Sequence, residues 1–115
     1  MPVQKRPRLF LRGMKASKGG NGMENEVRDN KQEGRFELAL EGGQAAYVVY
    51  EEAGDGVLAL THTEVPEEFE GKGIGGALVK GALEIVRGEG LKIVPACQFV
   101  SAYLRRHPEY QELVD

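Results

Sequence analysis

The residues best suited to binding a ligand form a glycine-rich stretch in the second half of the chain. Four glycines fall within six residues, directly before a run of helical periodicity: Gly71, Gly73, Gly75 and Gly76. The first N–H groups of a helix lack partners inside it, and the helix dipole adds partial positive charge there. Glycine lets such a backbone approach an anion without a blocking Cβ. The stretch, with Lys72 at its rim, predicts either a phosphate-binding turn or a loop packed tightly on its helix.

The glycine spacing excludes the P-loop and argues against a dinucleotide fold. No Gly-Lys-Ser/Thr follows at the spacing that a P-loop needs. Gly71-x-Gly73-x-x-Gly76 matches the dinucleotide pattern, but that pattern directly follows the first strand of a larger parallel sheet. Three expected strands precede it here, and too little chain follows.

Cys97 and His62 are the side chains best suited to group transfer. Cys97 stands at an expected helix start, where the local field lowers the pKa of a thiol and favours the nucleophilic thiolate. His62 lies on an expected strand and can act as a general base near neutral pH. Strand alternation predicts that Leu60, His62 and Glu64 share one face, so Glu64 could be a base or orient His62. The structural alternatives are a small buried cysteine, a hydrogen-bonded sheet histidine and a solvated carboxylate.

Six elements are expected to position these side chains. Alternation of apolar residues predicts strands at 35–40, 45–52 and 56–65, joined by glycine-containing turns. Helical periodicity follows over 74–89, then a short strand at 91–95 and a helix at 97–107 with Phe99, Val100 and Tyr103 on its inner face. A last short turn is expected at 108–114. The predicted fold is α/β of the α+β kind, a three-stranded antiparallel meander followed by helix–strand–helix.

The charge distribution divides the chain into a basic leader and an acidic body. Residues 1–22 hold six Lys/Arg and no acid, whereas residues 23–115 hold nine Lys/Arg against eighteen Asp/Glu. Residues 1–33 are therefore expected to be a disordered leader and 34–115 a single domain. An acidic body argues against nucleic-acid binding, although the leader leaves a basic arm possible in principle.

One cysteine and two histidines predict no disulfide framework and no Cys-rich zinc site. We expect a cytoplasmic protein without a membrane span.

Two long stretches carry a resemblance to a known family. The sequences LTHTEVPEEFEGKGIGGALVKGAL (60–83) and GLKIVPACQFVSAYLRRHPEY (90–110) resemble the GCN5-related N-acetyltransferases, most closely their minimal, single-domain YjdJ-like members. The resemblance covers residues 34–115 and predicts a mixed sheet of that family's kind. The family's pyrophosphate motif, Gln/Arg-x-x-Gly-x-Gly/Ala, is matched from Glu70 to Gly75. Glu70 departs from the motif, which has Gln or Arg at this position. Its carboxylate would stand near a bound pyrophosphate.

The resemblance implies acetyl-CoA as co-substrate and an unidentified amine, small molecule or protein, as acceptor. The main chain of Thr63, Glu64 and Val65 would face the pantetheine arm. The pyrophosphate would lie on the backbone of six residues: Gly71, Lys72, Gly73, Ile74, Gly75 and Gly76. Two routes stay open, direct attack with His62 as base and transfer through acetyl-Cys97. Tyr103 could protonate the leaving thiolate, but its spacing favours core packing.

Two other functions compete with acetyl transfer. Glu70 and the small size of the domain are compatible with a CoA-binding or protein-interaction module that has little or no turnover. The basic leader is compatible with a nucleic-acid-associated protein, which the acidic body makes the least favoured alternative.

Overall fold

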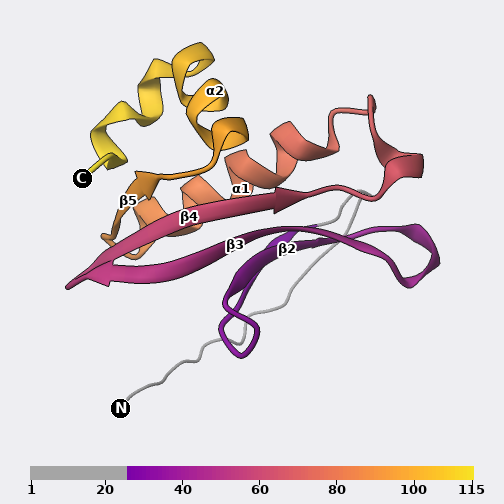
Figure 1. The fold of residues 1–115 in the computed structure, drawn as a ribbon, viewed down its shortest axis with the longest axis horizontal. Helices are drawn as coiled ribbons and strands as arrows, with labels where there is room; N and C mark the ends of the chain where they lie inside the picture. The colour runs from indigo at the N-terminus through magenta and orange to yellow at the C-terminus, as the bar shows by residue number, and fades with distance from the viewer. Residues whose placement is uncertain (1–25) are drawn as a thin grey trace.

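The computed structural model describes residues 26–115 as a five-stranded sheet with two helices (Figure 1). The strands are β1 (Val27–Asn30), β2 (Arg35–Ala39), β3 (Ala45–Gly54), β4 (Val57–Glu64) and β5 (Lys92–Pro95). They lie in chain order; the first four are antiparallel, and β5 runs parallel to β4. The predicted α+β class and mixed sheet are confirmed.

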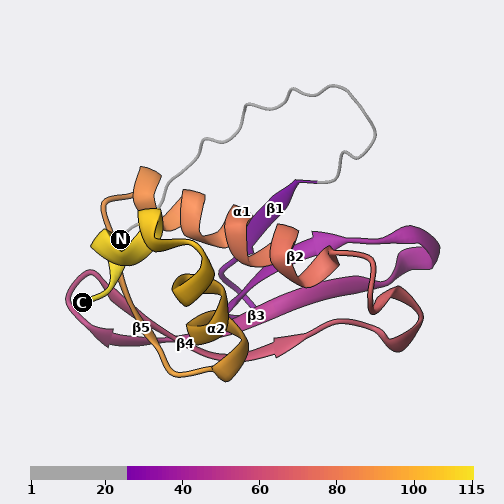
Figure 2. The same cartoon turned by 90° about the horizontal axis from the view of Figure 1, so that it is seen from above.

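The helices are α1 (Ile74–Gly88) and α2 (Gln98–Arg106), close to the predicted ranges. Short 3-10 turns span Glu41–Gly43, Glu67–Phe69 and Pro108–Leu113. Both helices lie on one face of the sheet, and α1 passes over β1 and β2 (Figures 1 and 2). No helix in the described part of the chain covers the other face, and none is both long and apolar enough to cross a membrane.

One core lies between the helices and the sheet. Alternation on β2 and β3 directs Phe36, Leu38 and Val48 toward the helices, where all three are buried. Helix α1 meets them with a stripe of five buried residues: Leu78, Val79, Ala82, Leu83 and Val86. Ile74 and Ile85 lie at the border of this stripe and are half-buried.

The expected leader boundary at residue 34 is wrong, because strand β1 belongs to the sheet. Val27 pairs with Leu38 and Asn30 with Arg35 along the edge of β2. Gly81 of α1 lies directly above Val27, and a Cβ on Gly81 would come within 2.6 Å of the Val27 Cβ. The absent side chain lets the helix rest on the edge strand. Residues 1–25, which hold the rest of the predicted leader, lie outside the described residues.

A β-bulge in β4 changes which way its last residues face. Leu60 pairs with Tyr50, but the next partners are His62 with Val49 and Thr63 with Val48, so Thr61 is an extra residue. Because Val48 is buried under the helices, Thr63 shares its helix-side face. His62 and Glu64 therefore project from the open face. The prediction that Leu60 and His62 share a face is wrong.

Strands β4 and β5 pair only over part of β4. Their register runs from Val57 with Lys92 to Leu60 with Pro95, and it ends there. Beyond the bulge, β4 continues to Glu64 beside β3 alone, while the chain after Pro95 turns into α2. The β5 side of the last β4 residues is thereby left for other partners.

Candidate functional site

The glycine turn has the geometry of an open helix start. Gly71 and Gly73 have φ values of 80° and 77°, in the left-handed region that favours glycine, and a Cβ on either would meet nothing within 4 Å. Gly73 is the N-cap of α1, and no side chain caps it. The first hydrogen bond of the helix is donated by Ala77 N–H to Gly73 C=O, at 3.1 Å. The preceding N–H groups therefore have no acceptor within the helix.

These N–H groups border a cleft of about 380 Å³. One wall is the end of β4 and the turn that follows it, a second is the glycine turn with the start of α1, and a third is the first turn of α2. The lining residues are Thr63, Val65, Phe69, Glu70, Gly71, Gly73, Ile74, Gly75, Gly76 and Phe99. The structure thus brings seven of the nine predicted cofactor-binding residues to one cleft. Lys72 and Glu64 are the two that do not line it.

Phe99 forms the α2 wall of the cleft. It was expected on the inner face of its helix, but its side chain is 40% exposed. Its ring rests on Gly75, where a Cβ would collide with the ring tip. Gly75 therefore serves close packing of the two helix starts, whereas Gly71 and Gly73 serve the turn. Tyr103, one turn further along α2, is buried as predicted and stacks on His107 with ring centroids 4.1 Å apart.

Cys97, the predicted nucleophile, does not line the cleft, but its side chain contacts Thr63, which does. The Thr63 Oγ1 and Cys97 Sγ atoms are 3.3 Å apart, and either can donate. Partial burial works against the thiolate, but the Thr63 hydroxyl and the N–H groups of Val100, Phe99 and Thr63 outweigh it and lower the pKa of Cys97. The Cys97 side chain makes no capping hydrogen bond to α2. The N–H groups at the start of α2 act on the sulfur through their partial positive charge.

His62 forms a second polar pair on the opposite face of β4. Its Nε2 atom lies 2.9 Å from Glu64 Oε1, and the two side chains are 60% and 51% exposed. A carboxylate in this position fixes the orientation of the imidazole ring. Strand β4 thus presents Thr63, the partner of the Cys97 thiol, on its helix side and the His62–Glu64 pair on its open side.

The charged residues of the glycine stretch lie at the rim. Glu70 is exposed and borders the cleft next to Gly71. The Lys72 ammonium is 5.6 Å from the centre of the Phe69 ring, which holds it against the turn that precedes α1. An anion in the cleft would therefore meet one carboxylate and one ammonium at its edge.

Two features of the site have no signal in the local sequence pattern. The Thr63 hydroxyl as the partner of Cys97, and Phe99 as a cleft wall, both depend on contacts between elements far apart in the chain. Within residues 26–115, no three His, Cys, Asp or Glu side chains are grouped so that they could hold a metal ion.

Most of the described chain is similar to known proteins. The model of the GCN5-related N-acetyl-transferase family matches residues 35–113. Protein NATD1 of Mus musculus is 35% identical over 88 residues, which cover 76% of this chain and 80% of that protein. Protein NATD1 of Homo sapiens is 34% identical over 88 residues, with 76% and 78% covered.

A solved structure has a similar fold. The NMR solution structure of a GCN5-like protein from Staphylococcus aureus superposes with a TM-score of 0.60 at 27% sequence identity. The match covers 78% of this chain and 87% of that one.

Proposed function

Since the chain belongs to the GCN5-related N-acetyltransferase family, we propose that it transfers an acetyl group from acetyl-CoA to an amine. The observation that carries the proposal is the cleft where the uncapped start of α1 meets the unpaired end of β4. It is bordered by the N–H donors of the helix start and by Thr63, whose hydroxyl contacts the Cys97 sulfur behind it. The acceptor, a small molecule or a protein, is left open.

The shape and donors of the cleft fit CoA. The N–H groups of Ile74, Gly75 and Gly76 would receive the pyrophosphate, with Lys72 supplying charge from the rim. The apolar side chains of Val65 and Phe99 would flank the pantetheine arm. The main chain of residues 63–65, which has no β5 partner, would hydrogen-bond its amides.

The first route runs through Cys97. Its thiolate would attack the thioester carbonyl carbon, and CoA would leave as the thiolate, so that the acetyl group passes to the cysteine sulfur. The acceptor ammonium would first give a proton to solvent. The free amine would then attack that thioester and release the Cys97 thiolate, with its second proton passing to solvent. The lowered pKa of Cys97 and its contact with Thr63 support this route.

The second route is direct attack with His62 as the base. The imidazole would take a proton from the acceptor ammonium. The free amine would attack the thioester carbon of acetyl-CoA, so that CoA leaves as the thiolate and takes up the second proton of the amine. The His62–Glu64 pair on the open face supports this route if the acceptor approaches from that side while CoA lies on the helix side. The two routes therefore use opposite faces of one strand.

The experiment measures protein mass and turnover with acetyl-CoA and a panel of primary amines and lysine peptides. The Cys97 route predicts a protein-bound acetyl group that Cys97→Ala removes and that an amine discharges. The direct route predicts no adduct, with turnover lost in His62→Gln and kept in Cys97→Ala. Binding of CoA without turnover on any acceptor would instead support the alternative, a CoA-binding module with little or no activity.

A further inference from the structure

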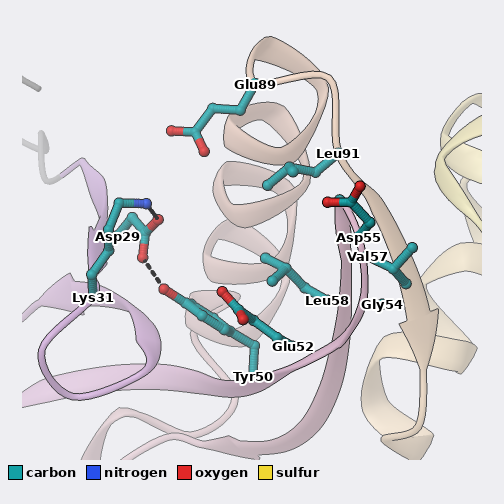
Figure 3. A pocket seen from close by; sticks show the side chains of 11 residues that line it. Asp29, Lys31, Tyr50, Glu52, Gly54, Asp55, Val57, Leu58, Glu89 and Leu91 are labelled. Atoms are coloured by element: carbon teal, nitrogen blue, oxygen red, sulfur yellow. Dashed lines mark hydrogen bonds and ion pairs between the residues drawn. The ribbon is translucent and has the colours of Figure 1, made fainter. Parts of the chain in front are cut away.

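A second, larger hollow lies at the opposite end of β4 from the cleft, and the proposed function does not use it. Its volume is about 650 Å³. It is bordered by β1, by the β3–β4 turn and by the end of α1 with the residues that follow (Figure 3). We call it the distal pocket, and its lining residues are Asp29, Lys31, Tyr50, Glu52, Gly54, Asp55, Gly56, Val57, Leu58, Glu89 and Leu91.

The rim of the distal pocket is acidic. It carries four carboxylates and one lysine: Asp29, Glu52, Asp55, Glu89 and Lys31. The Lys31 ammonium is already 2.7 Å from Asp29, and the Tyr50 hydroxyl donates to the other oxygen of Asp29 at 2.5 Å. Glu52, Asp55 and Glu89 form no ion pair with any described residue. Three carboxylates are therefore left for a cationic partner.

The floor of the distal pocket is apolar. Figure 3 shows Leu58 and Leu91 in its middle, with Asp29 on one side and Asp55 on the other. Burial and the nearby carboxylates raise the pKa of Tyr50, so its hydroxyl stays protonated and turned to Asp29. A ligand that matches this site has an apolar centre and positive charges at both ends.

We propose that the distal pocket binds a segment of the chain's own basic leader, residues 6–12, RPRLFLR. Leu9, Phe10 and Leu11 are the one apolar patch in residues 1–22, and Arg8 and Arg12 flank it directly. The apolar centre meets Leu58 and Leu91, and the guanidinium groups meet the free carboxylates of the rim. No residue of 1–22 is acidic, so the whole segment is attracted to this rim.

The distance along the chain permits this contact. Residues 13–25 connect the segment to the described part and span up to ~45 Å when fully extended. The longest extent of the molecule is 36 Å. Moreover, the connection ends beside the target, because Asp29 of the pocket follows residue 25 by only four positions. Tethering at such a short distance gives a high effective concentration, on the order of millimolar.

A zero-length carbodiimide cross-link on the full chain tests the contact. The reagent joins an ammonium to a carboxylate that touches it, and Lys5 directly precedes the docking segment. Peptide mapping should find Lys5 joined mainly to Glu52, Asp55 or Glu89. The double variant Asp55→Asn, Glu89→Gln should lower the yield about fivefold, whereas Glu41→Gln, Glu67→Gln, which removes the same charge elsewhere, should not.

Amide NMR spectra of the full chain give an independent reading. Replacing Arg8, Phe10 and Arg12 together by serine should shift the amides of Gly54, Gly56 and Gly90 and leave Gly71 and Gly73 unchanged. Unchanged amides around the distal pocket, or Lys5 cross-links spread evenly over the exposed carboxylates of the body, overturn the proposal. Neither result bears on acetyl transfer, because the cleft lies at the other end of β4.

Discussion

The Thr63 hydroxyl lies 3.3 Å from the Cys97 sulfur and joins the end of β4 to the start of α2. The contact exists because the bulge at Thr61 turns Thr63 toward the helices and turns His62 away. It forms beyond the point where β4 and β5 stop pairing. The bulge in β4 thus places the partner of the Cys97 thiol on one face of the sheet and the His62 imidazole on the other.

Removing the Thr63 hydroxyl should raise the pKa of Cys97. The hydroxyl is the largest of the contributions that lower this pKa, and Thr63→Val keeps the shape while removing the donor. Because one pKa unit corresponds to tenfold in the thiolate fraction below the pKa, we expect alkylation by iodoacetamide at pH 7 to slow by about threefold to tenfold. The pH midpoint of alkylation should move upward. Thr63→Ser is the matched control, and an unshifted midpoint in Thr63→Val would show that the hydroxyl does not stabilise the thiolate.

Two glycines of α1 should respond oppositely to alanine. A Cβ on Gly81 would collide with Val27 of β1, so Gly81→Ala should lower the free energy of unfolding by about 1–3 kcal/mol. Gly88 has open space, and Gly88→Ala should stabilise the helix by up to ~1 kcal/mol. Urea unfolding of the two variants measures both effects. Equal effects would mean that β1 does not pack on α1 as described.

Glu70 should weaken CoA binding. Its carboxylate borders the cleft next to the backbone that would hold the pyrophosphate. Glu70→Gln removes this charge, so CoA should bind about twofold to fivefold more tightly at low salt, and the gain should shrink as salt is added. Glu67→Gln, an exposed carboxylate that does not line the cleft, is the control. Unchanged affinity in Glu70→Gln would place this side chain out of reach of the ligand.

The spacing of apolar residues predicted the strands and helices well, because the strand and helix periods depend only on residues close together in the sequence. The strands around Phe36, Val48 and Leu60 and the helix from Ile74 follow this rule. The bulge was missed because Thr61 to Glu64 carries polar residues at every position, so alternation holds no information on which side faces the core.

Long-range contacts explain the other differences. Strand β1 has one apolar residue, Val27, and its place depends on Gly81, which lies 54 positions later. Phe99 has helical spacing with buried Tyr103, yet it lies in the first turn, where α2 borders the cleft. Both placements depend on which helix and strand pack together in three dimensions, and local periodicity carries no information on such contacts.

Calorimetry with acetyl-CoA tests the central claim, that the cleft beside the glycine turn binds this co-substrate. We predict one binding site in the full chain and at least about tenfold weaker binding in Gly73→Val, since φ there is 77° and the turn must change. Gly43→Val is the matched control, because Gly43 has φ of 79° and open space but lies outside the cleft. Retained binding in the control and weakened binding in Gly73→Val support the account. No measurable binding of acetyl-CoA or CoA to the unaltered chain would contradict it.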